Sequence, residues 1–287
     1  MDQKVCIITG ANSGIGKQAA IQIANSGAHV VIACRSEQRG LAALKDIKAA
    51  IRGGSAELKL LDMASQNSIK SFADDISRSF PKVDVLIHNA ADFNIARKQA
   101  EYSPDGIETV WAANHVGPVL LTELLMDQLK ASVNGRVITI SSKGLLVKSG
   151  TKVVLIDPEF KLRKYSVTDA YYQSKRAQEM YTQYLARQLA GSSVTANCIR
   201  VTAVKIDISR YPDLSRIARF MYSLKSKASI SPEQMAKTYT YLALSEDVSG
   251  ISGKCFDEKN QMVTMNAYTT DTKNIDDVMT LTRQYFK

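Results

Sequence analysis

The sequence predicts an α/β protein in which a parallel sheet is covered by helices on both faces. Short runs of consecutive apolar residues alternate with longer segments whose apolar residues have helical spacing, along most of the 287 residues. Continuous apolar runs are typical of strands buried on both faces, as in parallel sheets. Because crossovers between parallel strands are almost always right-handed, we expect a doubly wound, Rossmann-like sheet of about seven strands in the order 3-2-1-4-5-6-7.

The elements follow one another in a regular order. A strand at 4–9 ends in a glycine-rich turn, and a helix with one apolar face follows at 14–26. The other predicted strands lie at 29–34, 57–61, 83–88, 136–140, 194–200 and 253–256. The other predicted helices lie at 37–51, 66–80, 105–131, 169–189 and 232–244. The sequence contains no repeat or linker, so we expect a single domain over residues 1–287.

Two segments interrupt this alternation. After the sixth strand, residues 213–225 have apolar residues at helical spacing, and basic residues outnumber acidic ones on their other side and flanks. An amphipathic helix packed on the core, with a solvated basic face, accounts for this pattern. The tail at 257–287 is polar and then weakly helical near 275–286, and little else can be predicted about it.

Composition is typical of a globular protein. Apolar residues make up 45% of the sequence and charged residues 23%, which argues against both disorder and a membrane bundle. No run of about 18 uncharged apolar residues could span a bilayer, and the first strand begins too early for a signal peptide to precede it. We therefore expect a cytoplasmic protein without a transmembrane segment. The net charge of +9 comes from scattered residues, so we expect no nucleic-acid binding.

The cysteines predict no metal site. Cys6, Cys34, Cys198 and Cys255 are far apart, and each lies in an apolar run that is predicted to be a strand. Cysteine-based metal sites usually need closely spaced pairs, which this sequence lacks. Free cysteine packs as a small apolar residue. The pattern therefore predicts buried, reduced thiols.

The turn between the first strand and the first helix has glycines that suit a phosphate group. Gly10 permits a tight turn, whereas Gly14 and Gly16 let the backbone and the helix N-terminus approach a pyrophosphate. The spacing differs from the common dinucleotide fingerprint GxGxxG, and a purely structural turn explains the glycines about as well. The turn therefore indicates a dinucleotide only in the company of other motifs.

The end of the second strand indicates which dinucleotide is bound. About 20 residues beyond such a turn, NAD-binding folds carry an acidic side chain for the ribose 2′-hydroxyl. This sequence has Arg35 and then Ser36 at that point. An arginine fork can bind a 2′-phosphate at two points, so we expect NADP(H) rather than NAD(H). The alternative, an exposed surface arginine, leaves the missing acid unexplained.

The predicted helix at 169–189 carries a tyrosine and a lysine four residues apart. Tyr171 and Lys175 share one helical face, where the ammonium can lower the pKa of the phenol and stabilise the phenolate. Such a pair can act as a general acid or base. A Tyr-x3-Lys pair is also common on ordinary helix surfaces, and Tyr172 is an adjacent competitor. The pair therefore gains weight only from the other motifs.

Taken together, these motifs resemble those of the short-chain dehydrogenase/reductase family over about residues 4–256. The shared residues, in the order of the family, are Gly10, Gly14, Gly16, Asn89, Ala90, Asn114, Ser141, Ser142, Tyr171 and Lys175. Within the family, the chain is most similar to the branch of retinol dehydrogenases and light-dependent protochlorophyllide reductase. The similarity lies in TGANSGIGK at 9–17, ACRS at 33–36, Asn114-His115 and the long insertion between Ser142 and Tyr171. These motifs are specific for the fold and the reaction type, but not for the substrate.

The resemblance implies transfer of a hydride between nicotinamide and a carbonyl or alcohol carbon of a small molecule. Tyr171 would donate the proton in reduction or accept it in oxidation, while Lys175 would lower its pKa and hold the nicotinamide ribose. Ser142 would hydrogen-bond the substrate oxygen. Asn114 would organise a water that relays protons between Lys175 and solvent. The structural alternatives are a turn residue for Ser142 and a helix-bend residue for Asn114.

The resemblance also implies a cofactor site, a lid and self-association. Asp62 would meet the adenine amino group. The implied cofactor-binding residues are Gly10, Asn12, Ser13, Gly14, Ile15, Gly16, Arg35, Ser36, Asp62, Met63, Asn89, Ala90, Ala91, Tyr171 and Lys175. In the family, the region after the sixth strand covers the substrate, so residues of about 207–231 would form a small helical lid whose basic rim attracts an anionic group. Relatives often pair through the two long helices, which suggests a homodimer or homotetramer by analogy.

The chain departs from the branch at the nicotinamide end of the site. Where the branch usually has Pro-Gly followed by a hydroxyl residue that holds the carboxamide, this chain has Val201, Thr202 and Ile206. Ile206 cannot make that hydrogen bond. Ala91 also replaces a glycine of the family pattern. The way in which the branch holds the nicotinamide is therefore the property that we least expect this chain to share.

Three functions remain in competition. The first is an NADP(H)-dependent oxidoreductase of a bulky, largely apolar ketone, aldehyde or alcohol. The second is an NADP-binding regulator that has lost turnover, which the departures at 201, 202 and 206 would allow. The third is a light-driven reductase, which a pigment spectrum would distinguish. The intact set of Asn114, Ser142, Tyr171 and Lys175 favours the enzyme.

Overall fold

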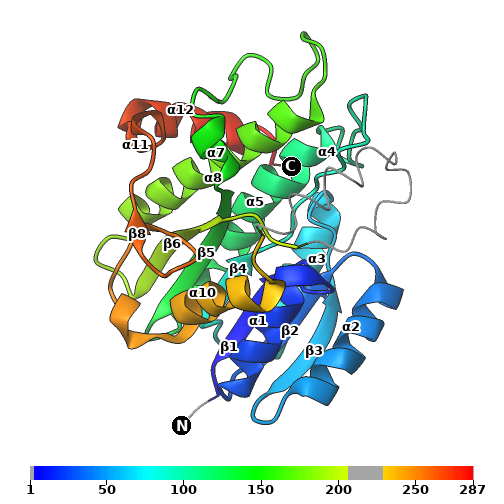
Figure 1. Cartoon of the computed structure of the whole chain (residues 1–287), viewed down its shortest axis with the longest axis vertical. Coiled ribbons are helices and arrows are strands. Elements are labelled where there is room, and N and C mark those ends of the chain that lie inside the picture. The colour runs from blue at the N-terminus through cyan, green and yellow to red at the C-terminus, as the bar shows by residue number, and fades with distance from the viewer. Residues whose placement is uncertain (1–2, 206–228, 287) are drawn as a thin grey trace.

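One sheet with helices on both faces runs through the molecule (Figure 1). The computed structural model describes residues 3–205 and 229–286 of the chain. In this part, the strands are β1 (Val5–Thr9), β2 (His29–Cys34), β3 (Ser55–Leu60), β4 (Val85–His88), β5 (Gly135–Ser142), β6 (Val194–Val201), β7 (Cys255–Phe256) and β8 (Met262–Val263). They pair in the order β3-β2-β1-β4-β5-β6-β7-β8. Strands β1 to β7 pair in parallel, and β8 pairs with β7 in the antiparallel sense.

The predicted doubly wound sheet and the order of its first seven strands are confirmed. Strand β8 was not predicted, because a two-residue strand is too short to show a period in the sequence. Strand β5 is longer than predicted and includes Ser141 and Ser142, which pair with Arg200 and Val201 of β6. All four cysteines lie in strands, buried and free of disulfides, as predicted.

Helices cover both faces of this sheet. Within the described residues they are α1 (Gly14–Asn25), α2 (Glu37–Ala50), α3 (Gln66–Ser79), α4 (Thr109–Trp111), η1 (Ala112–Val116), α5 (Gly117–Leu124), α6 (Met126–Lys130), α7 (Gly144–Val147), α8 (Val167–Gln188), α10 (Pro232–Leu244), η3 (Glu246–Val248), α11 (Ala267–Thr270) and α12 (Thr272–Arg283). Helices α2, α3, α8 and α10 each begin after a serine whose hydroxyl accepts a backbone N–H of the first turn. Such caps satisfy donors that have no partner within the helix.

The prediction of one helix at 105–131 is wrong. Gly106, with φ of 76°, lies in a turn, and the helical stretch begins only at Thr109. Residues Ala112–Val116 then form a π-helical turn, and a break at Leu125 separates α5 from α6. The apolar spacing continues through both irregularities because much of this stretch is buried, so periodicity alone could not reveal them.

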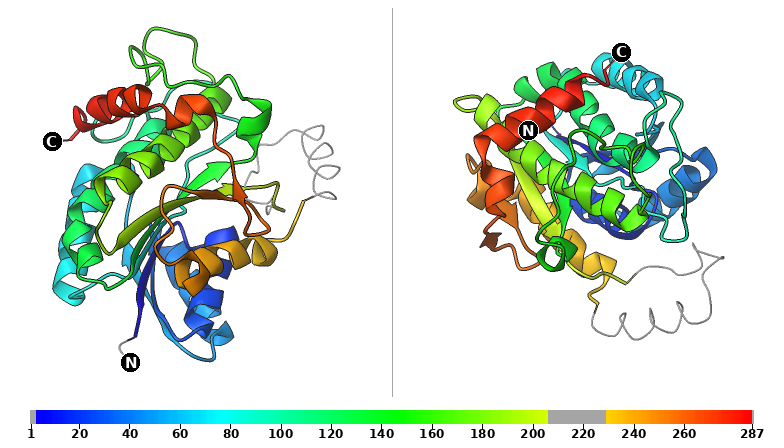
Figure 2. Two further views of the ribbon diagram at one scale, coloured as in Figure 1. Left: turned by 90° about the vertical axis from the view of Figure 1, so that its left-hand side faces the viewer. Right: turned by 90° about the horizontal axis from the view of Figure 1, so that it is seen from above.

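Alternate strand residues supply two apolar cores, one on each face of the sheet. Ile7 packs with the core that contains Trp111 and Tyr181, under α3, α5 and α8. Its neighbour Ile8 packs with the opposite core, which includes Tyr239 under α1 and α10. Figure 2 shows these two groups of helices on opposite sides of the sheet. Burial on both faces explains why the strands are apolar throughout.

The tail, for which the sequence predicted only weak helical character near 275–286, forms α11 and α12, which pack on α8 (Figure 2). On its inner face, Val278 is fully buried and Thr282 Oγ1 lies 2.7 Å from His115 Nε2. At the end of α12, the Arg283 guanidinium bonds Glu123 at 3.2 Å and the Tyr184 hydroxyl at 2.8 Å. Relatives often form oligomers through their two long helices, and α12 covers part of one of these helices, α8. Self-association of this chain stays a prediction.

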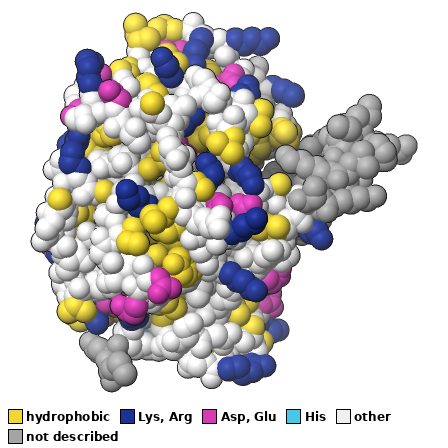
Figure 3. Space-filling model, turned by 60° about the vertical axis from the view of Figure 1, so that its left-hand side comes forward, with side chains coloured by type: hydrophobic (Ala, Val, Ile, Leu, Met, Phe, Trp, Pro, Cys, Tyr) yellow, Lys and Arg dark blue, Asp and Glu magenta, His cyan; other side chains and the backbone are white. Residues whose placement is uncertain are grey.

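Several predictions concern the segment between β6 and α10. The lid proposed at about 207–231 lies outside the described residues except for 229–231, and so does Ile206. Within that short part, Ile230 forms a bridge with Val204, and Ser231 caps α10. Where the chain is described, we find no helix that is long and apolar enough to cross a membrane, and no cluster of side chains suited to a metal ion. On the face shown in Figure 3, basic side chains are spread among apolar and acidic ones.

Replacing Gly10 by alanine should destabilise the fold. Gly10 has φ of 67°, and a Cβ there would lie 2.8 Å from the backbone Cα of Ala90. We expect Gly10→Ala to lower the free energy of unfolding by on the order of 2 kcal/mol, because strain and overlap add. A Cβ at Gly150 meets nothing within 4 Å, so Gly150→Ala is the control. Urea unfolding of the cofactor-free protein measures both variants, and equal effects would contradict the prediction.

Candidate active site

The carboxyl ends of β1, β2, β4, β5 and β6 open into one cavity of about 800 Å³. Ligands of doubly wound sheets bind at this edge, where the strand order reverses. Every residue predicted to bind the cofactor lines this cavity, and so does Ser142. Asn114 does not line it and lies behind it. The motifs had linked these residues only because they follow one another along the chain in the order of the family. The fold brings them together around one cavity.

The glycine turn places the N-terminus of α1 at the cavity. Gly10 is packed against Ala90, and a Cβ at Gly16 would collide with the amide of Asn89. That amide donates to the carbonyls of Thr9 at 2.9 Å and Gly10 at 3.2 Å, which holds the turn against the end of β4. The hydroxyl of Ser13 does not cap α1, and no acid lies in its first turn. The backbone N–H groups at this end are suited to an anion such as a pyrophosphate.

Basic groups lie at the end of β2. The Arg35 side chain is 69% exposed, and its Nη1 lies 3.9 Å from Oδ2 of Asp62. Ser36 caps α2 by accepting the N–H of Arg39, and the Arg39 side chain also lines the cavity. Nothing in the sequence singled out Arg39, because a basic residue in the first turn of a helix is usually solvated. Two guanidinium groups and a helix N-terminus can together bind a phosphate monoester.

The ammonium of Lys175 is almost completely buried beside Tyr171. Lys175 is only 2% exposed, and its Nζ donates a hydrogen bond to the carbonyl oxygen of Ile140 at 2.9 Å. The same Nζ lies 5.6 Å from the ring centre of Tyr171. Burial lowers the pKa of Lys175 to about 8, so the group still carries its charge at neutral pH. A buried positive charge stabilises a nearby phenolate more strongly than the same charge would in water.

The structure distinguishes Tyr171 from its neighbour Tyr172. Tyr171 lines the cavity, and its ring centre lies 4.5 Å from that of Phe93. Tyr172 does not line the cavity and instead packs against Gly144, where a Cβ would collide with its hydroxyl. Tyr171 is therefore the tyrosine that a bound molecule could reach.

Ser141 and Ser142 both line the cavity, but the hydrogen bonds of their hydroxyls differ. Successive side chains of a strand point to opposite faces. The Ser141 hydroxyl donates to Glu179 Oε1 at 2.6 Å in the protein interior. The Ser142 hydroxyl accepts the N–H of Gly144 at 3.2 Å, so its proton remains available for an oxygen atom in the cavity.

Asn114 lies in the π-helical turn and bonds to the protein on three sides. Its Oδ1 accepts the backbone N–H of Asp92 at 2.6 Å, and its Nδ2 donates to the carbonyl of Asp92 at 3.0 Å and to Ser174 Oγ at 3.1 Å. Ser174 lies between Tyr171 and Lys175 on α8. Asn114 therefore connects the loop after β4 to the helix that carries the tyrosine and the lysine.

Three further ring-bearing residues, His88, Phe93 and Tyr239, lie at this site. His88 is buried, its Nε2 lies 2.7 Å from Thr122 Oγ1, and burial together with the charge of Lys175 lowers its pKa to about 3. It is therefore a neutral packing residue. Tyr239, from α10, lines the cavity and donates to Asn89 Oδ1 at 3.2 Å. Phe93 also lines the cavity, and nothing in the sequence singled out either aromatic residue.

Comparison with known proteins gives consistent matches. A family model described as short chain dehydrogenase matches residues 4–213. Human Retinol dehydrogenase 13 is 37% identical over 264 residues, which cover 90% of this chain and 77% of that protein. Mouse Retinol dehydrogenase 14 is 34% identical over 267 residues, which cover 89% of this chain and 78% of that protein.

Solved structures show the same fold. The structure of an uncharacterized protein from Mycobacterium paratuberculosis has a TM-score of 0.75 and 27% identity, with 99% of this chain and 93% of that chain covered. A 3-oxoacyl (acyl-carrier-protein) reductase from Agrobacterium tumefaciens, solved with NADP bound, has a TM-score of 0.69 and 25% identity, with 88% of this chain and 92% of that chain covered.

Lys175 should make the stability of the cofactor-free protein depend on pH. Its pKa in the folded state is about 8 and its ordinary value is 10.5. Between these values the unfolded chain binds more protons, so the wild type gains stability as pH rises through this window. Lys175→Met removes the buried charge, and its stability advantage over wild type should shrink by up to about 3 kcal/mol from pH 7 to pH 10.

The control for this prediction is Lys48→Met, on the exposed face of α2. Denaturant unfolding at several pH values measures both variants against wild type. A pH dependence that is the same in Lys175→Met and wild type would show that Lys175 titrates no differently in the folded and unfolded states.

Proposed function

The chain belongs to the short-chain dehydrogenase/reductase family, in the branch of the retinol dehydrogenases, and we propose that it uses NADP(H) to interconvert a bulky, apolar alcohol and its aldehyde or ketone. As a member of this family, it is an oxidoreductase that acts on alcohol or carbonyl groups. The observation that carries the proposal is the buried ammonium of Lys175 beside Tyr171, at a cavity that Ser142 also lines. A cytoplasmic location is part of the proposal.

The basic groups at the end of β2 support NADP(H) as the cofactor. Arg35 and Arg39 line the cavity next to the N-terminus of α2, in the position where a ribose phosphate would lie. The Arg35 fork is exposed and is 3.9 Å from Asp62, so it can turn toward a phosphate. The similar reductase from Agrobacterium tumefaciens, solved with NADP, agrees with this choice. When bound, the nicotinamide supplies or takes up the hydride.

The protein's own residues have distinct roles in the proposed reaction. The Tyr171 hydroxyl donates a proton to the carbonyl oxygen in reduction and accepts it back in oxidation. The Lys175 ammonium stabilises the phenolate that remains. The Ser142 hydroxyl donates a hydrogen bond to the same substrate oxygen and stabilises its developing charge. Asn114 fixes the loop after β4 on α8. In the proposed reaction it also organises a water that relays protons between Lys175 and solvent.

An apolar substrate is favoured by the relatives and by the cavity wall. Two relatives are named for retinol, a long apolar alcohol. Apolar residues line the cavity near Ser142 and Tyr171, among them Phe93, Ile140 and Val201. Burial of such a molecule against these side chains would contribute roughly 25 cal/mol per Å² of apolar surface. We therefore propose an aldehyde or alcohol with a long hydrocarbon part.

The alternative is a regulator that binds NADP(H) without turnover. It is motivated by Val201 and Thr202, which line the cavity where relatives carry other residues, and by Ile206. NADPH oxidation with aldehydes of increasing length, up to retinal, separates the two functions. We expect turnover whose kcat/KM rises with the apolar length of the substrate. Tight NADPH binding without turnover of any aldehyde in the series would favour the regulator.

Reversing the charge of Arg35 should change the cofactor preference. Arg35→Asp should weaken NADPH binding by about 10-fold or more, because a carboxylate would face the 2′-phosphate, and should improve NADH binding. Arg52→Asp makes the same charge change at an exposed site outside the cavity wall and should leave both affinities nearly unchanged. Fluorescence titration measures them. A wild-type preference for NADH would refute the 2′-phosphate argument.

Removing one hydroxyl should identify the proton donor. Tyr171→Phe should lower kcat by at least about 100-fold, since general acid catalysis is lost, while the affinity for NADPH changes little. Tyr172→Phe is the matched control, because this ring faces Gly144 and not the cavity. Steady-state kinetics with the best aldehyde of the series measures both. If the two variants behave in the opposite way, the donor is Tyr172.

A further inference from the structure

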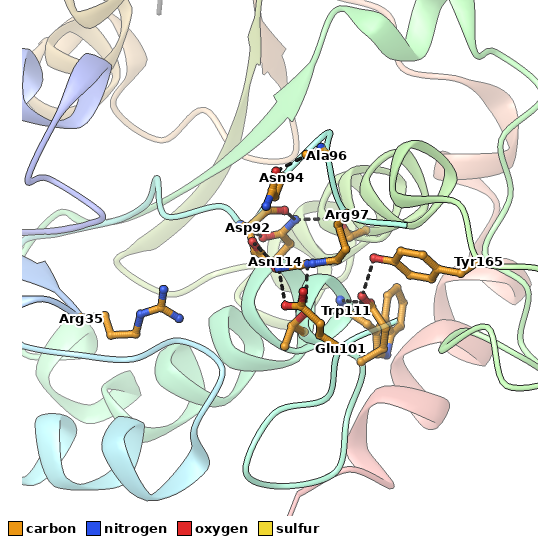
Figure 4. A network of polar contacts seen from close by, with 12 residues as sticks. Arg35, Asp92, Asn94, Ala96, Arg97, Glu101, Trp111, Asn114 and Tyr165 are labelled. Atoms are coloured by element: carbon orange, nitrogen blue, oxygen red, sulfur yellow. Dashed lines mark hydrogen bonds and ion pairs between the residues drawn. The ribbon is translucent and has the colours of Figure 1, made fainter. Parts of the chain in front are cut away.

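A buried arginine holds the loop that follows β4 (Figure 4). The Arg97 side chain is 9% exposed and makes a bidentate contact with the carboxylate of Asp92, with Nη1 2.6 Å from Oδ2 and Nη2 3.4 Å from Oδ1. Such two-point contacts fix the relative orientation of the two groups as well as their separation. Residues 92 and 97 therefore lie in a fixed relation across a loop that has no helix or strand of its own.

Arg97 is in turn fixed to its surroundings. Nη2 lies 2.9 Å from Glu101, and Nη1 donates to Thr109 Oγ1 at 3.1 Å, at the start of α4. Burial alone would lower the pKa of Arg97, but the bond to Asp92 and the nearby Tyr165 and Glu101 outweigh it, so the pKa is raised. The guanidinium is therefore a permanent charge with partners on several sides, and it connects the loop to the helical stretch that contains the π-turn.

Asp92 passes this restraint to the catalytic helix. Both of its backbone polar groups bond to the side chain of Asn114, and the remaining N–H of that amide reaches Ser174 on α8. The Ser174 hydroxyl donates to the carbonyl of Tyr171 at 2.7 Å. A continuous chain of polar contacts thus runs from Arg97 to the backbone of Tyr171.

Phe93 makes a second connection. It follows Asp92 directly, lines the cavity, and its ring centre lies 4.5 Å from that of Tyr171. Both rings pack against the small apolar cluster that includes Val110 and Phe160. A shift of Asp92 would therefore move the ring that limits where the Tyr171 side chain can lie.

We propose that Arg97 is a positioning residue, which holds Phe93 against Tyr171 through Asp92 and so keeps the phenolic hydroxyl directed at the substrate oxygen. The proposal rests on the function proposed above, because it assigns Tyr171 the proton transfer. Arg97 itself touches neither the cavity nor the reacting atoms. Small displacements of a catalytic group lower turnover strongly, whereas the cofactor site around Gly10 and Arg35 makes no contact with this loop arginine.

The first test needs no turnover. Hydrogen exchange followed by mass spectrometry reports on the N–H of Asp92, which donates to Asn114. In Arg97→Met we expect faster exchange of a peptide that covers residues 89–101, because the carboxylate of Asp92 has lost its partner. Arg187→Met, which breaks an Arg–Asp pair at the far end of α8, is the control. Unchanged exchange in Arg97→Met would overturn the restraint.

The second test separates turnover from binding. Arg97→Met should lower kcat by about 10-fold while its Kd for NADPH stays within about 2-fold of wild type. Arg97→Lys keeps a charge near Asp92 and should restore part of the lost kcat. Arg187→Met should behave as wild type. Two results would overturn the positioning role. The first is faster hydrogen exchange in Arg97→Met with an unchanged kcat. The second is an equal loss of kcat in Arg97→Met and Arg97→Lys together with weaker NADPH binding.

A double-mutant cycle tests the route through Phe93. Phe93→Leu should lower kcat and leave the exchange of residues 89–101 near that of wild type. If Arg97 acts through this ring, the kcat of the double variant should be only slightly below that of the less active single variant. Losses that multiply would overturn the route. If the wild type shows no turnover with any aldehyde, the proposed function fails, and the exchange experiment still decides whether the arginine restrains the loop.

Discussion

A positive charge with almost no access to water constrains how the central sheet and its longest described helix pack together. The ammonium of Lys175 is buried, and the carbonyl of Ile140 at the end of β5 accepts one of its hydrogens. Burying a charge is costly, and hydrogen bonds such as this one lower the cost. The contact requires α8 to keep its register on β5, and two further contacts between these elements do so, between Thr139 and Thr182 and between Ser141 and Glu179. The sheet, its helix and the cavity wall thus depend on one another through this lysine.

Most of the sheet could be predicted because a parallel sheet with helices on both faces gives its strands a simple signature. The runs that contain Ile7, Val31 and Ile138 are apolar on both faces, so their positions and order followed from the alternation with helices. The π-turn around Asn114 could not be predicted in this way, since it inserts a residue into a helix that is largely buried. Strand β8 was missed because a two-residue strand shows no period, whereas α12 agrees with the weak helical pattern near 275–286 and only its packing on α8 could not be foreseen.

The candidate site divides along the same line. Glycines, the Tyr171 and Lys175 pair and the serines after Ile140 could be found from spacing, because each lies at the end of a predictable strand or on one helix. Phe93, Asp92 and Arg97 lie in an irregular loop, and their significance comes from contacts with Tyr171 and Asn114 that only the folded chain creates. Arg39 and Tyr239 reach the cavity from helices whose sequences are ordinary. Sequence pattern therefore found the residues that line the cavity at strand ends and on α8 better than the residues that support them.

The position of α12 has a consequence for how the protein matures. This helix is translated long after α8, yet its Ile275, Val278 and Met279 are buried in the same apolar cluster as residues of α8. While a ribosome synthesises the chain, the outer surface of α8 is therefore bare until α12 has left the exit tunnel. Apolar surface that is exposed during synthesis can aggregate. Docking of α12 is therefore the step that removes this apolar surface of α8 from water.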